Sequence, residues 1–200
     1  MTTHIWFVLV KEKIDRIINE YSEITGDYGL LKTIPSTLDQ DGLFLEFGVA
    51  TGRTINLIAK YCPNVTVYGF DSFKGLPERW RTVNAGFFAQ EKLPQVEQNV
   101  QLIEGLFQET LDHFLQIKGT KISLCHIDCD LYSSTSYVLQ KLKPYFVDGS
   151  IIIFDEFALY DTYEQHEYRA FNEFLESTGF DVEYIGKNHK ESYAFKLVRK

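Results

Sequence analysis

The sequence predicts an α/β fold, a single doubly wound, mostly parallel sheet that ends in an antiparallel pair of strands. From residue 43 onward, apolar runs of strand length alternate with segments of helix length, the order expected of parallel strands joined by crossover helices. Two short apolar runs, 122–127 and 151–154, have the composition of strands buried on both faces. The last two runs, 182–185 and 192–197, indicate the closing antiparallel pair.

The first 40 residues are predicted to form a helical segment that packs on this core, with the sheet-forming domain at 41–200. A helix over 11–25 is predicted from apolar residues on one helical face, namely Ile14, Ile17, Ile18 and Tyr21. The apolar run 5–10 is too short to cross a membrane and lacks the flanks of a signal peptide, so we expect it to pack against the protein. A loop containing Pro35 follows.

The alternating region supplies five parallel strands and four helices. Strands are predicted at 43–47, 65–70, 100–104, 122–127 and 151–154. Helices are predicted at 54–61, 107–116, 133–143 and 162–177, and Gly179 after the last of them is a C-cap signal. Residues 48–52 are predicted to form a turn, and 72–94 a long connection.

Composition narrows the functional classes. The chain has 200 residues, of which 44% are hydrophobic, enough for one domain with a sizeable core. Its net charge of −8 argues against broad binding to nucleic acid or anionic membranes. The three cysteines, Cys62, Cys125 and Cys129, form neither a disulfide framework nor a CxxC motif, so we expect buried thiols in a cytoplasmic protein.

A glycine turn, EFGVATGRT at 46–54, lies between a predicted strand and a predicted helix. Glycine permits a tight turn and close approach of a ligand, and the helix N-terminus offers free N–H groups. Gly48 and Gly52 have GxxxG spacing rather than the dinucleotide fingerprint. Asp71 closes the next strand, 19 residues after Gly52. In dinucleotide-binding folds, an acid about 20 residues beyond the glycine turn binds ribose hydroxyls. Ribose binding is favoured over a turn-forming aspartate.

Four acids directly follow two predicted strands: Asp128 and Asp130 after one, and Asp155 and Glu156 after the other. The carboxyl ends of parallel strands meet at one edge of the sheet, where ligands bind. Gathered carboxylates there indicate an oxygen-bound divalent cation, acid–base chemistry, or both. The alternative is that Asp128 and Asp130 merely cap the helix near Ser133. One acid would suffice for that, and the others would repel each other without a cation.

For some other residues and for the connection 72–94, the sequence allows both a structural and a functional role. His126 falls inside a predicted strand and is interpreted as a core histidine. Glu164 and His166 open the late helix, and they either face the site or lie in an exposed polar turn. The connection 72–94 is a wall or lid over the ligand, a contact with a second protomer, or an ordinary surface loop. Its side chains slightly favour a contact role: Arg79, Trp80, Arg81, Phe87 and Phe88.

Five segments, taken in order, resemble the macrocin O-methyltransferase family: EFGVATGRT, GFDSFKGLPERW, VQLIEGLFQETL, HIDCDLYSST and IIIFDEF. The resemblance extends over about residues 43–198, and the helix EQHEYRAFNEFL is similar to bacterial relatives. These are class I S-adenosylmethionine-dependent methyltransferases with a Rossmann-like fold, several of which act on sugar hydroxyls with Mg²⁺. The resemblance implies that 41–200 binds S-adenosylmethionine, uses Mg²⁺ or a similar cation, methylates a small hydroxylated acceptor such as a sugar, and forms a homodimer.

The resemblance also implies residue roles. The methionine end of the cofactor would contact the glycine turn, through Glu46, Gly48, Ala50, Thr51, Gly52 and Thr54. Asp71 and Ser72 would hold the ribose. The adenine would lie near Gly105, Leu106 and Phe107. The metal would be held by Asp128, Asp155 and Glu156. Asp128 and Asp130 would be the catalytic pair, with Asp130 as the general base.

Two departures from the family pattern bear on the substrate. Position 156 is Glu, whereas sugar-modifying members usually have a second Asp there, so the longer arm shifts the metal site. The chain before the glycine turn is shorter than in antibiotic-pathway members, so macrolide-like acceptors are not expected.

Three alternatives remain open. A catechol-type O-methyltransferase shares the metal chemistry but takes a planar phenolic acceptor. An NAD(P)-dependent oxidoreductase is suggested by Tyr137 and Lys141, a YxxxK pair. The glycine turn lacks the TGxxxGxG pattern of those enzymes, and the four acids would have no task in them. A catalytically silent cofactor-binding module would be favoured by loss of the acids, but all four are present.

Overall fold

A seven-stranded sheet in the order β3-β2-β1-β4-β5-β7-β6 forms the centre of the molecule. The computed structural model describes residues 3–21, 26, 28–189 and 191–199. The strands are β1 Leu43–Phe47, β2 Val67–Asp71, β3 Val100–Glu104, β4 Ile122–Ile127, β5 Phe146–Phe154, β6 Asp181–Gly186 and β7 Tyr193–Val198. The first five are parallel, and β7 runs antiparallel to both β5 and β6. The predicted fold class, including the closing antiparallel pair, is confirmed.

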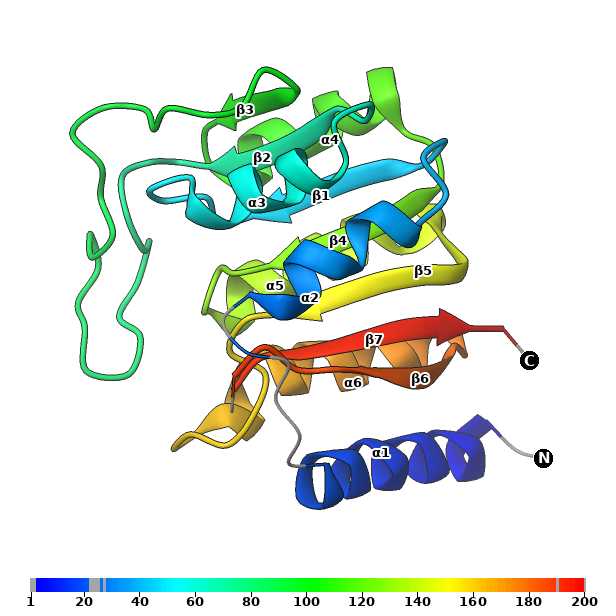
Figure 1. Ribbon diagram of the computed structural model, residues 1–200. Helices are drawn as coiled ribbons and strands as arrows, with labels where there is room; N and C mark the ends of the chain where they lie inside the picture. The colour runs from blue at the N-terminus through cyan, green and yellow to red at the C-terminus, as the bar shows by residue number, and fades with distance from the viewer. Residues whose placement is uncertain (1–2, 22–25, 27, 190, 200) are drawn as a thin grey trace.

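Helices cover both faces of the sheet (Figure 1). The helices α2 Gly29–Thr33 and α3 Arg53–Tyr61 lie on one face, over a core that contains Ile55 and Ile58. The other face carries α4 Phe107–Lys118, α5 Tyr132–Leu142 and α6 Glu167–Thr178. Helix α1, Thr3–Glu20, lies at the β6 edge beside α6. Short 3₁₀ segments occur at Pro35–Thr37 (η1), Lys143–Tyr145 (η2) and Tyr163–Gln165 (η3).

The N-terminal helix begins well before the predicted residue 11 and takes in the apolar run 5–10. It buries Val10, Ile14, Ile17 and Ile18 in the same core as the sheet. Val8 and Leu9 are exposed, and Tyr21 is 49% exposed with its ring 4.8 Å from that of Tyr184. The predicted helical end at 22–25 lies outside the described residues. Among the helices that the structure describes, none is both long and apolar enough to span a bilayer.

Other differences from the predicted bounds have local causes. Helix α6 begins at Glu167 rather than 162, because Thr162 at φ 70° and His166 at φ −114° and ψ −126° both interrupt the right-handed helical conformation. Its C-cap is Gly179 at φ 74°, as predicted. Strand β5 begins at Phe146 rather than 151, since polar residues and a glycine with φ 89° interrupt its apolar pattern. The short helix α2 was not predicted.

The register of the parallel strands aligns the last residues of β1, β4 and β5. Phe47 at the end of β1 pairs with Ile127 at the end of β4, and Ile127 pairs with Phe154 at the end of β5. The residues that follow β4 and β5 each donate one more backbone hydrogen bond, to the last residue of the neighbouring strand. Asp128 N bonds Phe47 O at 2.9 Å, and Asp155 N bonds Ile127 O at 3.0 Å. The carboxyl ends of β1, β4 and β5 are therefore fixed side by side.

An aromatic cluster supports the segment that follows β5. Phe157 is fully buried, and its ring contacts five other aromatic rings at centroid distances of 5.0–5.8 Å: Phe154, Tyr168, Phe171, Tyr193 and Phe195. These rings come from β5, α6 and β7, so this residue joins three elements directly behind Asp155 and Glu156.

Truncation of Phe157 should therefore destabilise the protein strongly. We expect Phe157→Ala to lower the free energy of unfolding by about 3–5 kcal/mol, because it leaves a cavity that this rigid aromatic surround cannot close. Urea unfolding followed by circular dichroism measures the loss. Phe87→Ala, at a residue 50% exposed, is the control and should stay within about 0.5 kcal/mol of the wild type. Equal effects of the two changes would contradict the prediction.

Candidate functional site

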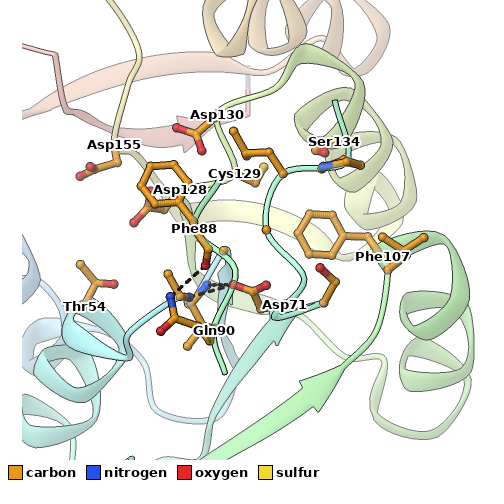
Figure 2. A pocket seen from close by; sticks show the side chains of 18 of the residues that line it. Thr54, Asp71, Phe88, Gln90, Phe107, Asp128, Cys129, Asp130, Ser134 and Asp155 are labelled. Atoms are coloured by element: carbon orange, nitrogen blue, oxygen red, sulfur yellow. Dashed lines mark hydrogen bonds between the residues drawn. The ribbon is translucent and has the colours of Figure 1, made fainter. Parts of the chain in front are cut away.

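A cleft of about 700 Å³ opens at the carboxyl edge of the sheet. Residues after β1, β2, β4 and β5 line it, together with the connection between β2 and β3. Figure 2 shows Asp128, Asp130 and Asp155 gathered on one side of this cleft and Asp71 on the other. The cleft lies where the strand order reverses between β1 and β4, the position at which open α/β sheets bind ligands.

The glycine turn requires its glycines. Gly48 and Gly52 have φ of 91° and 80°, a region that favours glycine. A Cβ on Gly48 would lie only 1.8 Å from the carbonyl oxygen of Asp128, so a larger residue would separate β1 from β4. Ala50 also has positive φ, 45°. The turn is thus packed directly against the start of the acidic segment.

Asp71 organises this turn through its carboxylate. Its Oδ2 accepts hydrogen bonds from the backbone N–H groups of Val49 and Ala50, both at 2.8 Å. Its Oδ1 accepts one from Phe73 N at 2.7 Å. Asp71 therefore has the turn-forming role that was considered as the alternative, and its binding of ribose stays a prediction. The carboxylate also lines the cleft, so it retains acceptor capacity for a ligand hydroxyl.

The acids after β4 and β5 converge as predicted. Carboxylate oxygens of Asp128, Asp155 and Glu156 all lie within 4.8 Å of one another. Asp130 is 5% exposed and has φ 62°. In the described chain the N-cap of α5 is Leu131, with no side-chain capping bond. The alternative that Asp128 and Asp130 serve as helix caps is therefore wrong.

Burial and like charge act together on these acids. Burial, followed by the charges of Asp155 and Asp130, raises the pKa of Asp128 well above its usual range. Burial and the charge of Asp155 raise the pKa of Asp130 to about 7, although Arg81 opposes the shift. Burial and the charges of Asp128 and Asp155 raise the pKa of Glu156 likewise. The site is thus short of positive charge.

Asp155 is the exception. Burial alone would raise its pKa, but the imidazoles of His189 and His126 outweigh burial and lower it. His189 Nε2 lies 3.4 Å from Asp155 Oδ1, an ion-pair distance. Within the described chain, Asp155 Oδ1 and Glu156 Oε2 are buried oxygens without a hydrogen-bond partner. Hard oxygens that lack a hydrogen bond and lie beside a third carboxylate fit a divalent cation such as Mg²⁺.

Glu46 and His126 form a buried pair beneath the cleft. Glu46 Oε2 lies 2.8 Å from His126 Nδ1, and Thr54 Oγ1 donates to Glu46 Oε1 at 3.1 Å. Burial raises the pKa of Glu46. Burial would lower the pKa of His126, but its hydrogen bond to Glu46 raises it. His126 is a core histidine, as interpreted from the sequence, and it joins β4 to β1.

Most of the residues implied as cofactor contacts line the cleft: Gly48, Ala50, Thr51, Thr54, Asp71, Ser72, Gly105, Leu106 and Phe107. The described lining residues do not include Glu46, which lies in the buried pair, or Gly52, which shapes the turn. The acids Asp128, Asp130, Asp155 and Glu156 all line it.

Sequence reasoning missed several residues at the site. Glu167 on α6 is fully buried, and its Oε2 accepts a hydrogen bond from the backbone N–H of Glu156 at 3.2 Å. His189, in the turn between β6 and β7, approaches Asp155. Tyr28 lines the cleft. Gln90 also lines it and lies in the connection 72–94, for which a contact role was predicted without naming this residue. Glu167, His189 and Tyr28 come from distant segments that only folding brings near.

The connection between β2 and β3 is a wall of the cleft, through Gly75, Leu76, Pro77, Glu78, Phe88 and Gln90. It extends from the carboxyl edge of the sheet, at the left of Figure 1. Arg81 anchors it: the guanidinium lies 4.3 Å from the ring centroid of Tyr160 and 3.1 Å from Glu191 Oε2. Trp80 is 7% exposed, so this part of the connection is packed rather than free in solvent.

Two other pairs of candidate residues, Tyr137 with Lys141 and Glu164 with His166, are not among the described residues that line the cleft. Lys141 Nζ pairs with Asp112 Oδ2 at 2.7 Å and lies over the Tyr137 ring. The described residues of the cleft wall include neither member of this YxxxK pair, and they include neither Glu164 nor His166. The geometry expected of an NAD(P)-dependent oxidoreductase is therefore not assembled at this site.

A family model for a methyltransferase domain matches residues 45–157, more than half of the chain and the region that builds the cleft. The chain belongs to this methyltransferase family. With its sheet order, it is a class I S-adenosylmethionine-dependent methyltransferase. A search of curated proteins finds no significant match.

Solved structures share the fold of this methyltransferase. Calicheamicin methyltransferase CalS11 has a TM-score of 0.62 and 22% identity, over 94% of this chain and 91% of that one. The O-methyltransferase NovP has a TM-score of 0.62 and 17% identity, over 96% and 79%. An O-methyltransferase from Bacillus cereus in complex with SAH has a TM-score of 0.55 and 13% identity, over 98% and 90%. At these identities the likeness shows the fold alone.

Without added cation, the methyltransferase should lose stability as pH rises. Asp128, Asp130 and Glu156 have raised pKa values in the folded protein, so the folded state binds more protons than the unfolded chain. Their contribution is complete below the ordinary carboxyl pKa of about 4. For Asp130 it is lost as pH passes through about 7. Urea unfolding in EDTA at about pH 5, 6, 7 and 8 should show the decline.

The variant Asp130→Asn should flatten that pH dependence, because asparagine does not titrate and tolerates positive φ. Asp112→Asn, at an exposed pair on α4, is the matched control and should leave the pH dependence unchanged. A free energy of unfolding that rises steadily over the same range would show that the acids are not coupled as described.

The methyltransferase should bind S-adenosylmethionine through Asp71. We expect Asp71→Ala to weaken the affinity by about 10- to 100-fold, because the turn loses its acceptor and a ligand hydroxyl loses a charged partner. Calorimetric titration with S-adenosylmethionine measures the change, and Asp112→Ala should bind like the wild type. Parallel titration with NAD(H) should show no binding. Wild-type affinity in Asp71→Ala would remove this residue from the cofactor site.

Proposed function

We propose that this methyltransferase transfers a methyl group to a hydroxyl of a small molecule or sugar with the help of a divalent cation. One observation carries the proposal. The three mutually close carboxylates of Asp128, Asp155 and Glu156 lie in the same cleft as the glycine turn and Asp71. A cofactor site and a hard-cation site that share one cleft suit transfer to an oxygen nucleophile.

The cofactor would lie along the carboxyl ends of β1, β2 and β3. Its methionine end would contact the glycine turn, where Thr51 and Thr54 line the cleft at the start of α3. Asp71 and Ser72 would bind the ribose hydroxyls. The backbone and side chains of 105–107 would border the adenine. S-adenosylmethionine, when bound, supplies a methyl group attached to a positively charged sulfur.

Asp128, Asp155 and Glu156 would hold the cation. A divalent cation there would offset the like-charge repulsion that raises the pKa values of Asp128 and Glu156, and it would make a coordinated hydroxyl more acidic. The longer side chain of Glu156 is compatible with this task, because its carboxylate reaches the other two in the structure.

Asp130 would accept the proton of the acceptor hydroxyl. It lies beside Asp128 and Asp155 (Figure 2), lines the cleft and is nearly buried. Burial is the first cause of its raised pKa and makes it a stronger proton acceptor than an exposed aspartate. The residues around it would also orient the acceptor, because methyl transfer needs the oxygen opposite the leaving sulfur. Positioning and proton removal are thus the protein's main contributions.

The acceptor would enter beside the connection between β2 and β3. Leu76 and Phe88 offer it apolar contacts, and Ser133 and Ser134 at the start of α5 offer hydroxyls. Among the structures with this fold, CalS11 is described as a TDP-rhamnose 3′-O-methyltransferase. That description supports a hydroxyl of a sugar as the first acceptor to examine.

The proposal predicts cation-dependent methylation. Transfer of labelled methyl from S-adenosylmethionine to a panel of sugars, polyols and catechols should require Mg²⁺ and stop in EDTA. Asp128→Asn should abolish the response to Mg²⁺. Asp130→Asn should lower kcat by about 10²- to 10⁴-fold and leave the affinity for S-adenosylmethionine unchanged.

The panel also separates the alternatives. Turnover of catechols alone would replace the sugar-type acceptor by a planar phenol. Full activity in EDTA would overturn the cation's role. Tight cofactor binding with no transfer to any hydroxylated acceptor would support a catalytically silent module.

A further inference from the structure

Glu167 is a buried acid that no step of the proposed reaction uses. It is the first residue of α6 and is fully buried. Its Oε2 accepts the backbone N–H of Glu156 at 3.2 Å. In the part of the chain that the structure describes, its Oε1 is buried without a hydrogen-bond partner. An uncompensated buried carboxylate is costly for a fold, so its position calls for a functional reason.

The hydrogen bond from the Glu156 backbone to Glu167 connects the two ends of the segment between β5 and α6. Glu156 and Glu167 are eleven residues apart in sequence, and the segment between them connects β5 to α6. Next to Glu156, the N–H groups of Phe157 and Ala158 both donate to Glu191 O, at 2.7 and 3.2 Å. The backbone at 156–158 is therefore held on one side by α6 and on the other by the turn between β6 and β7.

With the preceding residue, Asp155, this backbone carries two of the three carboxylates of the proposed cation site. Asp155 is fixed by its own backbone bond to Ile127 O. Among the described residues, the backbone N–H of Glu156 donates instead to the side chain of Glu167. Within the described residues, the group of mutually close carboxylates does not include Glu167. Its hydrogen bond to this segment goes to the backbone of Glu156.

We propose that Glu167 is a positioning residue of the cation site, which orients the Asp155–Glu156 segment through its hydrogen bond to the Glu156 backbone. This inference rests on the proposed cation site. The required property is an acceptor oxygen at the end of a side chain of this length. Negative charge is not required, which distinguishes this role from direct binding of the cation.

Three substitutions separate these roles. Glu167→Gln keeps the length and an acceptor oxygen but removes the charge. Glu167→Asp keeps the charge but withdraws the oxygen by one methylene. Glu167→Ala removes both. Glu176→Ala, at an exposed residue of the same helix, controls for general effects on α6.

The measurement is direct titration with Mn²⁺, with free Mn²⁺ followed by electron paramagnetic resonance. We expect Glu167→Gln to bind Mn²⁺ within about threefold of the wild type. Glu167→Asp and Glu167→Ala should bind it about 10- to 100-fold more weakly, the usual effect of removing a partner behind a metal ligand. Calorimetric affinity for S-adenosylmethionine should stay unchanged in all variants, which shows that the fold and the cofactor site are intact.

Several results would overturn the inference. Wild-type Mn²⁺ affinity in Glu167→Ala would show that this hydrogen bond does not position the site. Loss in Glu167→Gln with retention in Glu167→Asp would show that charge, and not the hydrogen bond, is what matters. Absence of Mn²⁺ binding to the wild-type protein would overturn the cation site itself, and the role of Glu167 with it. Only that last result counts against the proposed function.

Discussion

The alignment of β4 between β1 and β5 is the constraint on which the rest of the site depends. Because Phe47, Ile127 and Phe154 are paired across these strands, the chain leaves all three strands at the same level. Gly48 lies tight against the carbonyl of Asp128, so the glycine turn and the acidic segment cannot move independently. A single backbone register thus sets the distance between the two halves of the cleft.

Electrostatic interactions set the pKa values of the acids at the carboxyl edge of the sheet. Burial favours the neutral form of a carboxyl group, and each nearby acid adds to that preference. The raised pKa values of Asp128 and Glu156 follow from both effects. Asp155 differs because its contacts with His189, His126 and Glu156 lower its pKa. An arrangement of this kind is costly to maintain without a compensating positive charge, and the divalent cation that we propose would supply that charge.

Segments far apart in the sequence complete the site from outside the sheet. The connection between β2 and β3 forms one wall and is held by the contacts of Arg81 with Tyr160 and Glu191. The turn between β6 and β7 brings His189 toward Asp155, and α6 brings Glu167 to the Glu156 backbone. The antiparallel strand β7 makes this possible, because its insertion beside β5 places the β6–β7 turn at the carboxyl edge.

The sequence by itself determined the elements whose signals are local. Apolar runs at β1, β3 and β4 have the predicted bounds, since a strand buried on both faces needs a continuous apolar segment. The placement of Asp71, Asp128 and Asp155 in one cleft also followed from the sequence, because parallel strands must end at a common edge. The tertiary structure alone decided what meets those acids. Glu167, His189 and the pairing of Glu46 with His126 depend on contacts between residues distant in the chain, and no spacing within one segment encodes such contacts.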